Sequence, residues 1–144
     1  MTSHERLADP RIQAFLASRE VLVLSTLDPD GAPLAMAMWY LLDPEALFMV
    51  SVAGTRKVRN LRHDRRVAVL AESGTRAPHI RGVSIQGRVE FLPDSPERRA
   101  LVERFLARYH PDLERLWGGR AMPDDRVMFR ITPDRVRSWG LGGA

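Results

Sequence analysis

The chain has 144 residues, of which 44% are hydrophobic and 28% charged, a composition typical of one globular domain with its own core. No apolar run approaches the roughly 18 residues of a transmembrane helix, and "MTSHERLADP" lacks the apolar segment of a secretory signal. The absence of cysteine excludes disulfides, a thiolate nucleophile and a cysteine-based metal site. The sequence therefore predicts one cytoplasmic domain over residues 1–144, without a membrane partner and with loose ends at 1–8 and 140–144.

The charge balance is basic, with a net charge of +4, and every basic residue except Lys57 is an arginine. Codon usage in a GC-rich genome is one explanation, and an anionic partner such as nucleic acid or a phosphorylated cofactor is another. Nucleic-acid binders usually interleave basic residues with exposed aromatic residues or place them on one helix. Here the arginines are spread along the whole chain, so we expect no nucleic-acid partner.

The first third of the chain predicts a short helix and a meander of three strands. Asp9 and Pro10 are typical of a helix start, which predicts a helix over residues 10–18. The aliphatic segment that follows predicts a buried strand, and "DPDG" after it predicts a tight turn. Because tight turns join antiparallel strands, the meander is predicted to be antiparallel. Its three strands are expected over residues 20–27, 32–42 and 46–51.

The remainder predicts two more helices and three more strands. In order they are a helix over 56–63, strands over 65–72 and 80–92, a helix over 93–110 opened by Asp94 and Glu97, and a strand over 126–140 broken by proline. Gly82 and Gly87 indicate bulges or a close approach of neighbouring backbone, and residues 111–125 are predicted to be mostly connection. Six strands with few helices predict an all-β barrel or an α+β domain.

Motifs of catalysis and metal binding give no assignment. The four histidines match no metal-ligand spacing, so no metal site is predicted. Surface histidines are the simplest interpretation, and a single axial haem ligand is an alternative for which His79 is the first candidate. No nucleophile elbow, dinucleotide fingerprint or phosphate-binding loop is present. The catalytic residues therefore stay unassigned.

The segment "SVAGTRKVRN" places two cations where a strand leads into a helix. Thr55 is predicted to begin this helix, and Arg56 and Lys57 follow it directly. Helix N-termini favour anions through their free N–H groups and dipole, so two cations there are unfavourable unless an anion lies between them. The competing interpretation is a solvated basic helix face, which is the commoner explanation of a charge run.

The segment "MAMWY" is the second unusual feature. In a strand, Met36, Met38 and Tyr40 share one face and Trp39 points to the other. A large flat ring can lie against such a strand, although core packing is the commoner role of methionine and aromatic side chains. Trp139 near the C-terminus has the same two explanations.

The order of these segments resembles a known family. A helix, a strand, the "DPDGAP" turn, a strand ending in Trp-Tyr, a strand ending in Val-Ser and then "GTRKVRNLRHDRRVAV" are similar to the pyridoxamine 5'-phosphate oxidase-like FMN-binding split β-barrel superfamily. Within it, the chain looks most like the F420-dependent flavin/deazaflavin oxidoreductases of actinobacteria. The resemblance runs from about residue 9 to residue 139. It implies a mainly β fold, a six-stranded antiparallel split barrel with peripheral helices, and a homodimer with a cofactor cleft between the subunits.

The resemblance also implies cofactor-binding residues. Arg56 and Lys57 take the phosphate, and Asn60 adds a hydrogen bond one turn later. The second strand supports the ring system, and the end of the third strand approaches the ribityl and phosphate part. The full set of expected cofactor-binding residues is Met36, Met38, Trp39, Val50, Ser51, Thr55, Arg56, Lys57, Asn60 and Trp139.

Two departures from the FMN enzymes favour coenzyme F420 over FMN. FMN-binding relatives carry basic residues in the second strand, where this chain reads "LAMAMWYLL", and a Gln where it has Gly82. The phosphate and oligoglutamate tail of F420 suit an arginine-rich groove, with Arg56 and Arg59 as tail contacts. The implied activity is hydride transfer between F420 and a small substrate. The alternatives are an FMN-dependent oxidoreductase of the same class and a non-catalytic protein that binds flavin, deazaflavin or haem.

Overall fold

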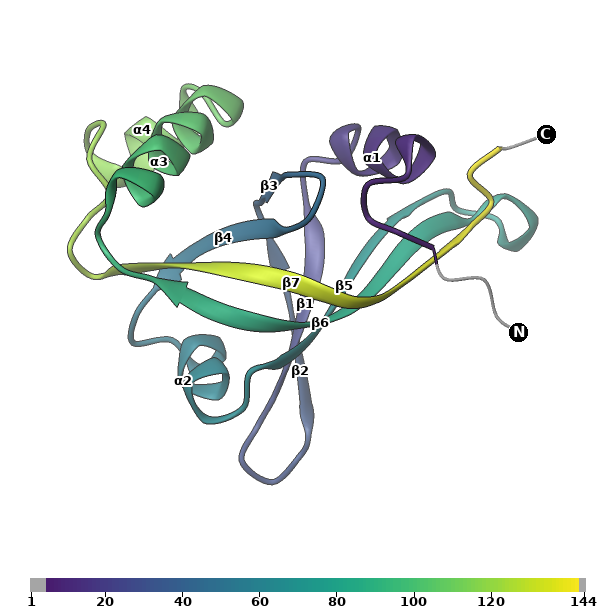
Figure 1. Ribbon diagram of the computed structural model, residues 1–144, viewed down its shortest axis with the longest axis horizontal. Coiled ribbons are helices and arrows are strands. Elements are labelled where there is room, and N and C mark those ends of the chain that lie inside the picture. Colours follow the sequence, from purple (N-terminus) through teal and green to yellow (C-terminus); the bar gives the residue numbers. More distant parts are fainter. Residues whose placement is uncertain (1–4, 143–144) are drawn as a thin grey trace.

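The computed structural model describes residues 5–142, and Figure 1 shows them as one strongly curled sheet with helices around it. The strands are β1 (Leu22–Leu27), β2 (Pro33–Met38), β3 (Leu41–Leu42), β4 (Leu47–Val52), β5 (Arg66–Ser73), β6 (Arg81–Leu92) and β7 (Arg126–Trp139). The helices are α1 (Pro10–Ala17), α2 (Arg56–His63), α3 (Pro96–Arg108) and α4 (Asp112–Trp117), with a 3-10 turn η1 (Ala77–His79). The pairs of neighbouring strands are all antiparallel, which confirms the predicted mainly β antiparallel fold.

The predicted second strand, over 32–42, is in fact two strands at opposite edges of the sheet. The strand order is β2-β1-β5-β6-β7-β4-β3, so the described sheet has seven strands and not the predicted six. Only Trp39 and Tyr40 separate β2 from β3, and such a connection spans at most about 11 Å. The sheet therefore curls until its two edges approach each other, and it forms a half-barrel.

The long strand β7 runs without the predicted break at its proline. Between Gln86 and Gly87 the pairing of β6 with β7 slips by one residue, which leaves Asp134 as the extra residue of a bulge beside Pro133. A Cβ on Gly87 would collide with the carbonyl oxygen of Thr132. The bulge accommodates a residue without an N–H donor, and the close approach predicted at Gly87 is confirmed.

Gly82 is the second predicted close approach. It pairs with Trp139 across the two strands. A Cβ at this position would lie 2.7 Å from the carbonyl oxygen of Ala71 and 2.7 Å from the ring of Trp139. The predicted close approach at Gly82 is confirmed, and the ring of Trp139 lies against this glycine.

The sheet carries a separate core on each face. We call the cluster beneath α1 the inner core; Leu47 and Met49 of β4 point into it. The cluster on the opposite face is the outer core, and Phe48 and Val50 of β4 point into it. Figure 1 shows α3 and α4 together over one end of the sheet, and there Phe105 of α3 packs into the outer core.

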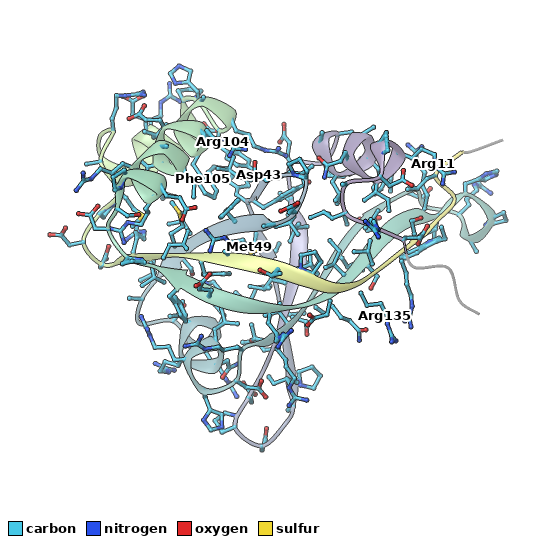
Figure 2. All side chains as sticks on the ribbon, in the orientation of Figure 1. Arg11, Asp43, Met49, Arg104, Phe105 and Arg135 are labelled. Atoms are coloured by element: carbon cyan, nitrogen blue, oxygen red, sulfur yellow. The ribbon has the colours of Figure 1, made fainter. Side chains whose placement is uncertain are left out.

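An ion pair joins α3 to the turn between β3 and β4. Arg104 is directed toward Asp43 in Figure 2, with 2.8 Å between their charged groups. The expected opening of α3 by Asp94 and Glu97 is wrong: Ser95 is the N-cap, and its side chain accepts a hydrogen bond from the N–H of Arg98. Asp94 instead pairs with arginines of the first turn.

The two chain ends are partly anchored. Residues 1–4 and 143–144, which belong to the segments predicted to be loose, lie outside the described residues. Within the described part, Leu7 is buried in the inner core and Leu141 packs against it. No helix in residues 5–142 has the length and apolar character needed to cross a membrane.

Candidate functional site

A cleft of about 440 Å³ opens where the outer core meets the ends of β2 and β4. Its lining residues are Val21, Ala37, Met38, Trp39, Val50, Ser51, Val52, Lys57, Phe105, Leu113, Leu116, Trp117 and Arg126. Small-molecule sites are typically clefts of this size, apolar with a few placed polar groups. Here Ser51, Lys57 and Arg126 are the polar members, and the lining contains no carboxylate. The cleft therefore suits an apolar body that carries negative charge.

One wall of the cleft is the fixed indole of Trp39. It stacks on Tyr109 of the loop after α3, with 4.3 Å between ring centroids and 11° between planes. The Tyr109 hydroxyl donates to the carbonyl oxygen of Glu20 at 2.8 Å and accepts the N–H of Tyr40 at 2.9 Å. Because two hydrogen bonds fix the Tyr109 hydroxyl, the ring beneath Trp39 is held in place and Trp39 presents a flat surface of defined orientation.

Lys57 forms the cationic corner of the cleft. Its side chain is half-buried, and this burial lowers its pKa below the ordinary 10.5. Among the described residues, no carboxylate lies within the 4.0 Å of an ion pair with Lys57. The Thr55 hydroxyl donates to the carbonyl oxygen of Val52 at 2.8 Å and does not cap α2. An ammonium and a helix start without a side-chain cap thus lie together, an arrangement that favours an anion.

Arg56, by contrast, is paired within the protein. Its guanidinium donates two hydrogen bonds to Asp28, at 3.0 Å and 2.7 Å. Asn60 donates to the same carboxylate at 2.8 Å and to the Thr26 hydroxyl at 3.1 Å. The hydrogen bonds from Asn60 and then from Arg56 lower the pKa of Asp28 below its ordinary 3.8. Arg56 and Asn60 therefore attach α2 to the end of β1, and neither lines the cleft.

The structure brings together half of the residues that the sequence pointed to. Met38, Trp39, Val50, Ser51 and Lys57 line the cleft. The others lie outside its lining: Met36 is exposed on β2, Thr55, Arg56 and Asn60 belong to the first turns of α2, and Trp139 ends β7 beside Gly82.

The candidate haem ligand also lies outside the cleft. His79 is exposed in η1 and does not line the cleft. Within residues 5–142, no group of three or more histidine or acidic side chains is arranged to hold a metal ion.

Sequence reasoning named no individual cleft residue in α4 or β7. Leu113, Leu116 and Trp117 have the spacing of one helix face, a signal that was present in a segment predicted to be mostly connection. Arg126 gave no signal, because it is one arginine among many. Its position becomes informative only when the fold places the start of β7 beside the end of β4.

Comparison with known proteins identifies the family. The family model described as pyridoxamine 5'-phosphate oxidase matches residues 8–140 of this chain. The chain belongs to this family. Its curled antiparallel sheet is therefore the split barrel of the pyridoxamine 5'-phosphate oxidase family, as the resemblance implied. Among curated proteins, none is similar enough to count as a match.

Several solved structures share the fold. The conserved hypothetical protein Rv2991 from Mycobacterium tuberculosis is 31% identical, with a TM-score of 0.78, and the match covers 98% of this chain and 91% of that one. A protein described as an F420 reductase is 26% identical, with a TM-score of 0.66 and coverage of 87% and 94%. HutZ, described as a heme storage protein from Vibrio cholerae, is 20% identical, with a TM-score of 0.77 and coverage of 92% and 94%. At that identity, HutZ indicates the shared fold alone.

Proposed function

We propose that this member of the pyridoxamine 5'-phosphate oxidase family is an F420-dependent oxidoreductase that acts on a small-molecule substrate. The observation that carries the proposal is Lys57, an ammonium without a carboxylate partner in the described chain, in an apolar cleft beside the uncapped start of α2. The similarity to an F420 reductase over most of both chains supports it.

The cleft fits the two parts of such a cofactor. Ala37, Met38 and Trp39 offer an apolar wall without charge for a ring system, and Lys57 with the first N–H groups of α2 offers a site for a phosphate. The β2 sequence "PLAMAM" contains no basic residue, which favours F420 over FMN. When bound, F420 supplies a hydride donor or acceptor at its C5 carbon.

The residues of this chain bind the cofactor, orient it and exclude water from the cleft. Trp39, held by Tyr109, fixes the plane of the ring, and Phe105 makes that side of the cleft apolar. Tyr40 is not available as a proton donor, because its hydroxyl is buried and donates to the carbonyl oxygen of Arg19 at 2.8 Å. Ser51 carries the one hydroxyl among the lining residues, but strand alternation directs it to the face of β4 opposite Val50 and Val52, so no proton-transfer role is assigned to it.

A second copy of the chain is proposed to complete the cleft. β2 is an edge strand with exposed Ala35, Met36 and Ala37, and an unpaired apolar edge is normally covered in the native assembly. Light scattering after gel filtration should show a dimer. Met36→Lys should shift it toward monomer, whereas Ile80→Lys, at a residue that is also 40% exposed, should not. A monomeric wild-type protein would contradict this assembly.

The experiment for the cofactor is a pair of fluorescence titrations, one with F420 and one with FMN. F420 should bind, and Lys57→Ala should weaken it about tenfold or more, as expected for loss of a buried charge-assisted contact. Arg62→Ala is the matched control, because it removes one exposed cation from the same helix outside the cleft. Failure of F420 to bind would overturn the proposal, and tighter binding of FMN would replace it with the FMN-dependent alternative.

A further inference from the structure

The cleft contains a second cation, Arg126, that the proposed cofactor contacts do not use. Arg126 begins β7 and pairs with Val52 of β4. Cross-strand partners project to the same face of a sheet, and both residues line the cleft. The Arg126 side chain is only 17% exposed. The side chain is therefore packed in an apolar site, while its unpaired nitrogens keep some accessible surface.

The pairing of Arg126 leaves most of its donors unused. Its carboxylate partner is its sequence neighbour Asp125, whose side chain is 66% exposed, and an ion pair with a solvated partner contributes little. One terminal nitrogen makes this contact. For the other side-chain N–H groups of Arg126, residues 5–142 provide no hydrogen-bond acceptor. A planar guanidinium with free donors is suited to a planar or multidentate anion.

The rim of the cleft is apolar and exposed. Large hydrophobic side chains are exposed at Val21, Val52 and Leu116, by 45%, 39% and 66%, and all three line this cleft. Exposed apolar side chains that gather at one concave site are typical of a surface that binds something apolar. Trp117 of α4 adds an aromatic ring to the same lining.

We propose that Arg126 determines substrate specificity, and that the substrate is an apolar, ring-containing organic anion. Its anionic group is bound by the free donors of Arg126, and its apolar body lies against Val52, Leu116 and Trp117. This inference rests on the proposed function in one respect, namely that Lys57 serves the cofactor and leaves Arg126 for the substrate. The absence of any carboxylate in the lining makes the cleft electrostatically complementary to such a molecule.

Two fluorescent probes isolate the anionic group. 8-Anilinonaphthalene-1-sulfonate and N-phenyl-1-naphthylamine share one ring system and differ by the sulfonate. The protein should bind the sulfonate more tightly than the neutral probe. Arg126→Gln should weaken the sulfonate about tenfold and leave the neutral probe unchanged. Arg137→Gln is the matched control, because Arg137 is an exposed arginine of the same strand outside the cleft.

Each outcome decides the inference. The inference is overturned if Arg126→Gln binds the sulfonate probe as tightly as wild type does. It is also overturned if Lys57→Ala, and not Arg126→Gln, weakens binding of the sulfonate probe. An equal loss of F420 and sulfonate binding in Arg126→Gln assigns Arg126 to the cofactor and also overturns it. If Arg126→Gln fails to fold by circular dichroism, Arg126→Lys replaces it and should bind the sulfonate less tightly than wild type. Failure of F420 to bind any variant overturns the proposed function but leaves discrimination between the probes intact, so the two failures are distinguishable.

Discussion

Arg56 and Asp28 hold each other through two hydrogen bonds, of 3.0 Å and 2.7 Å, that join the first turn of α2 to the turn after β1. The Asp28 side chain is only 11% exposed and also accepts a hydrogen bond from Asn60. Of the two adjacent cations expected to bind one phosphate, Lys57 is therefore the one without an acidic partner among the described residues. Arg56 has a positional role: it fixes where the start of α2, and with it Lys57, lies.

Asp28→Asn should destabilise the fold in a pH-dependent manner. The pKa of Asp28 is lowered in the folded state by hydrogen bonds from Asn60 and Arg56. Its stabilising contribution is therefore complete above the unfolded value of about 4 and is lost as the pH falls through the folded pKa. Thermal unfolding followed by circular dichroism should give a melting temperature a few degrees lower than wild type at pH 7, with the difference shrinking below pH 4.

Asp124→Asn is the control for this measurement, because Asp124 is exposed and forms no ion pair among the described residues. A wild-type melting temperature for Asp28→Asn at pH 7 would show that the Arg56–Asp28 pair contributes nothing to folding.

Anion binding at Lys57 should weaken at alkaline pH. Burial lowers the Lys57 pKa below 10.5, so the ammonium loses its proton at a lower pH than an exposed lysine does. Equilibrium dialysis of F420 from pH 7 to pH 10 should show affinity falling in wild type. Lys57→Arg should bind with less pH dependence, because the guanidinium stays charged. An equal decline in both proteins would place the titrating group elsewhere.

Bound cofactor should quench two of the three tryptophans. Trp39 and Trp117 line the cleft, whereas Trp139 lies at the end of β7 beside Gly82. F420 should therefore reduce the intrinsic fluorescence of the wild-type protein. The fractional reduction should be smaller in Trp39→Phe and in Trp117→Phe. Trp139→Phe should keep the full quenching and is the matched control. The opposite pattern, with quenching lost only in Trp139→Phe, would move the ligand to the other end of the sheet.

Tyr40→Phe should cost about 1 kcal/mol in the free energy of unfolding, because it removes a buried hydrogen bond. Both backbone acceptors keep another donor, the Arg108 guanidinium at the carbonyl of Arg19 and the Arg19 N–H at that of Leu16. The Tyr40 hydroxyl donates to the carbonyl oxygen of Arg19 at 2.8 Å and also contacts that of Leu16. Urea denaturation measures the change. An unchanged midpoint would show that water replaces the hydroxyl at the end of α1.

Tyr40 also predicts an alkaline effect. Burial raises the pKa of Tyr40 to about 12, so the folded state resists ionisation that the unfolded chain undergoes near pH 10. The wild-type free energy of unfolding should fall as the pH rises from 10 toward 12. Tyr40→Phe should show a smaller fall, and the remainder belongs to groups such as Tyr109, whose pKa burial also raises.

Sequence patterns predicted those helices and strands whose start and end are set by neighbouring residues. The bounds of α2, from Arg56 to His63, agree with the prediction from its sequence. The two edge strands could not be separated in this way, because "APLAMAMWYLL" is continuously apolar and no residue in it marks a change of partner strand. That change depends on the closure of the sheet, a property of the whole chain.

The site divides in the same manner. Met38, Val50 and Lys57 belong to segments whose order along the chain is typical of the family, so the resemblance found them. Arg126 and the residues of α4 enter the cleft only through the packing of distant elements. The Arg56–Asp28 pair joins residues 28 positions apart, and in the sequence Asp28 had the simpler explanation of a turn residue.

The contact between Gly82 and Trp139 makes two positions share one volume. The indole ring occupies the space that a side chain at residue 82 would need, and the carbonyl of Ala71 closes the other exit. Substitutions at these positions are therefore coupled: a larger residue at position 82 requires a smaller or displaced side chain at position 139, together with a shift of the backbone at Ala71. An exchange of side-chain size between the paired strands would be the evolutionary trace of this packing, readable from sequences alone.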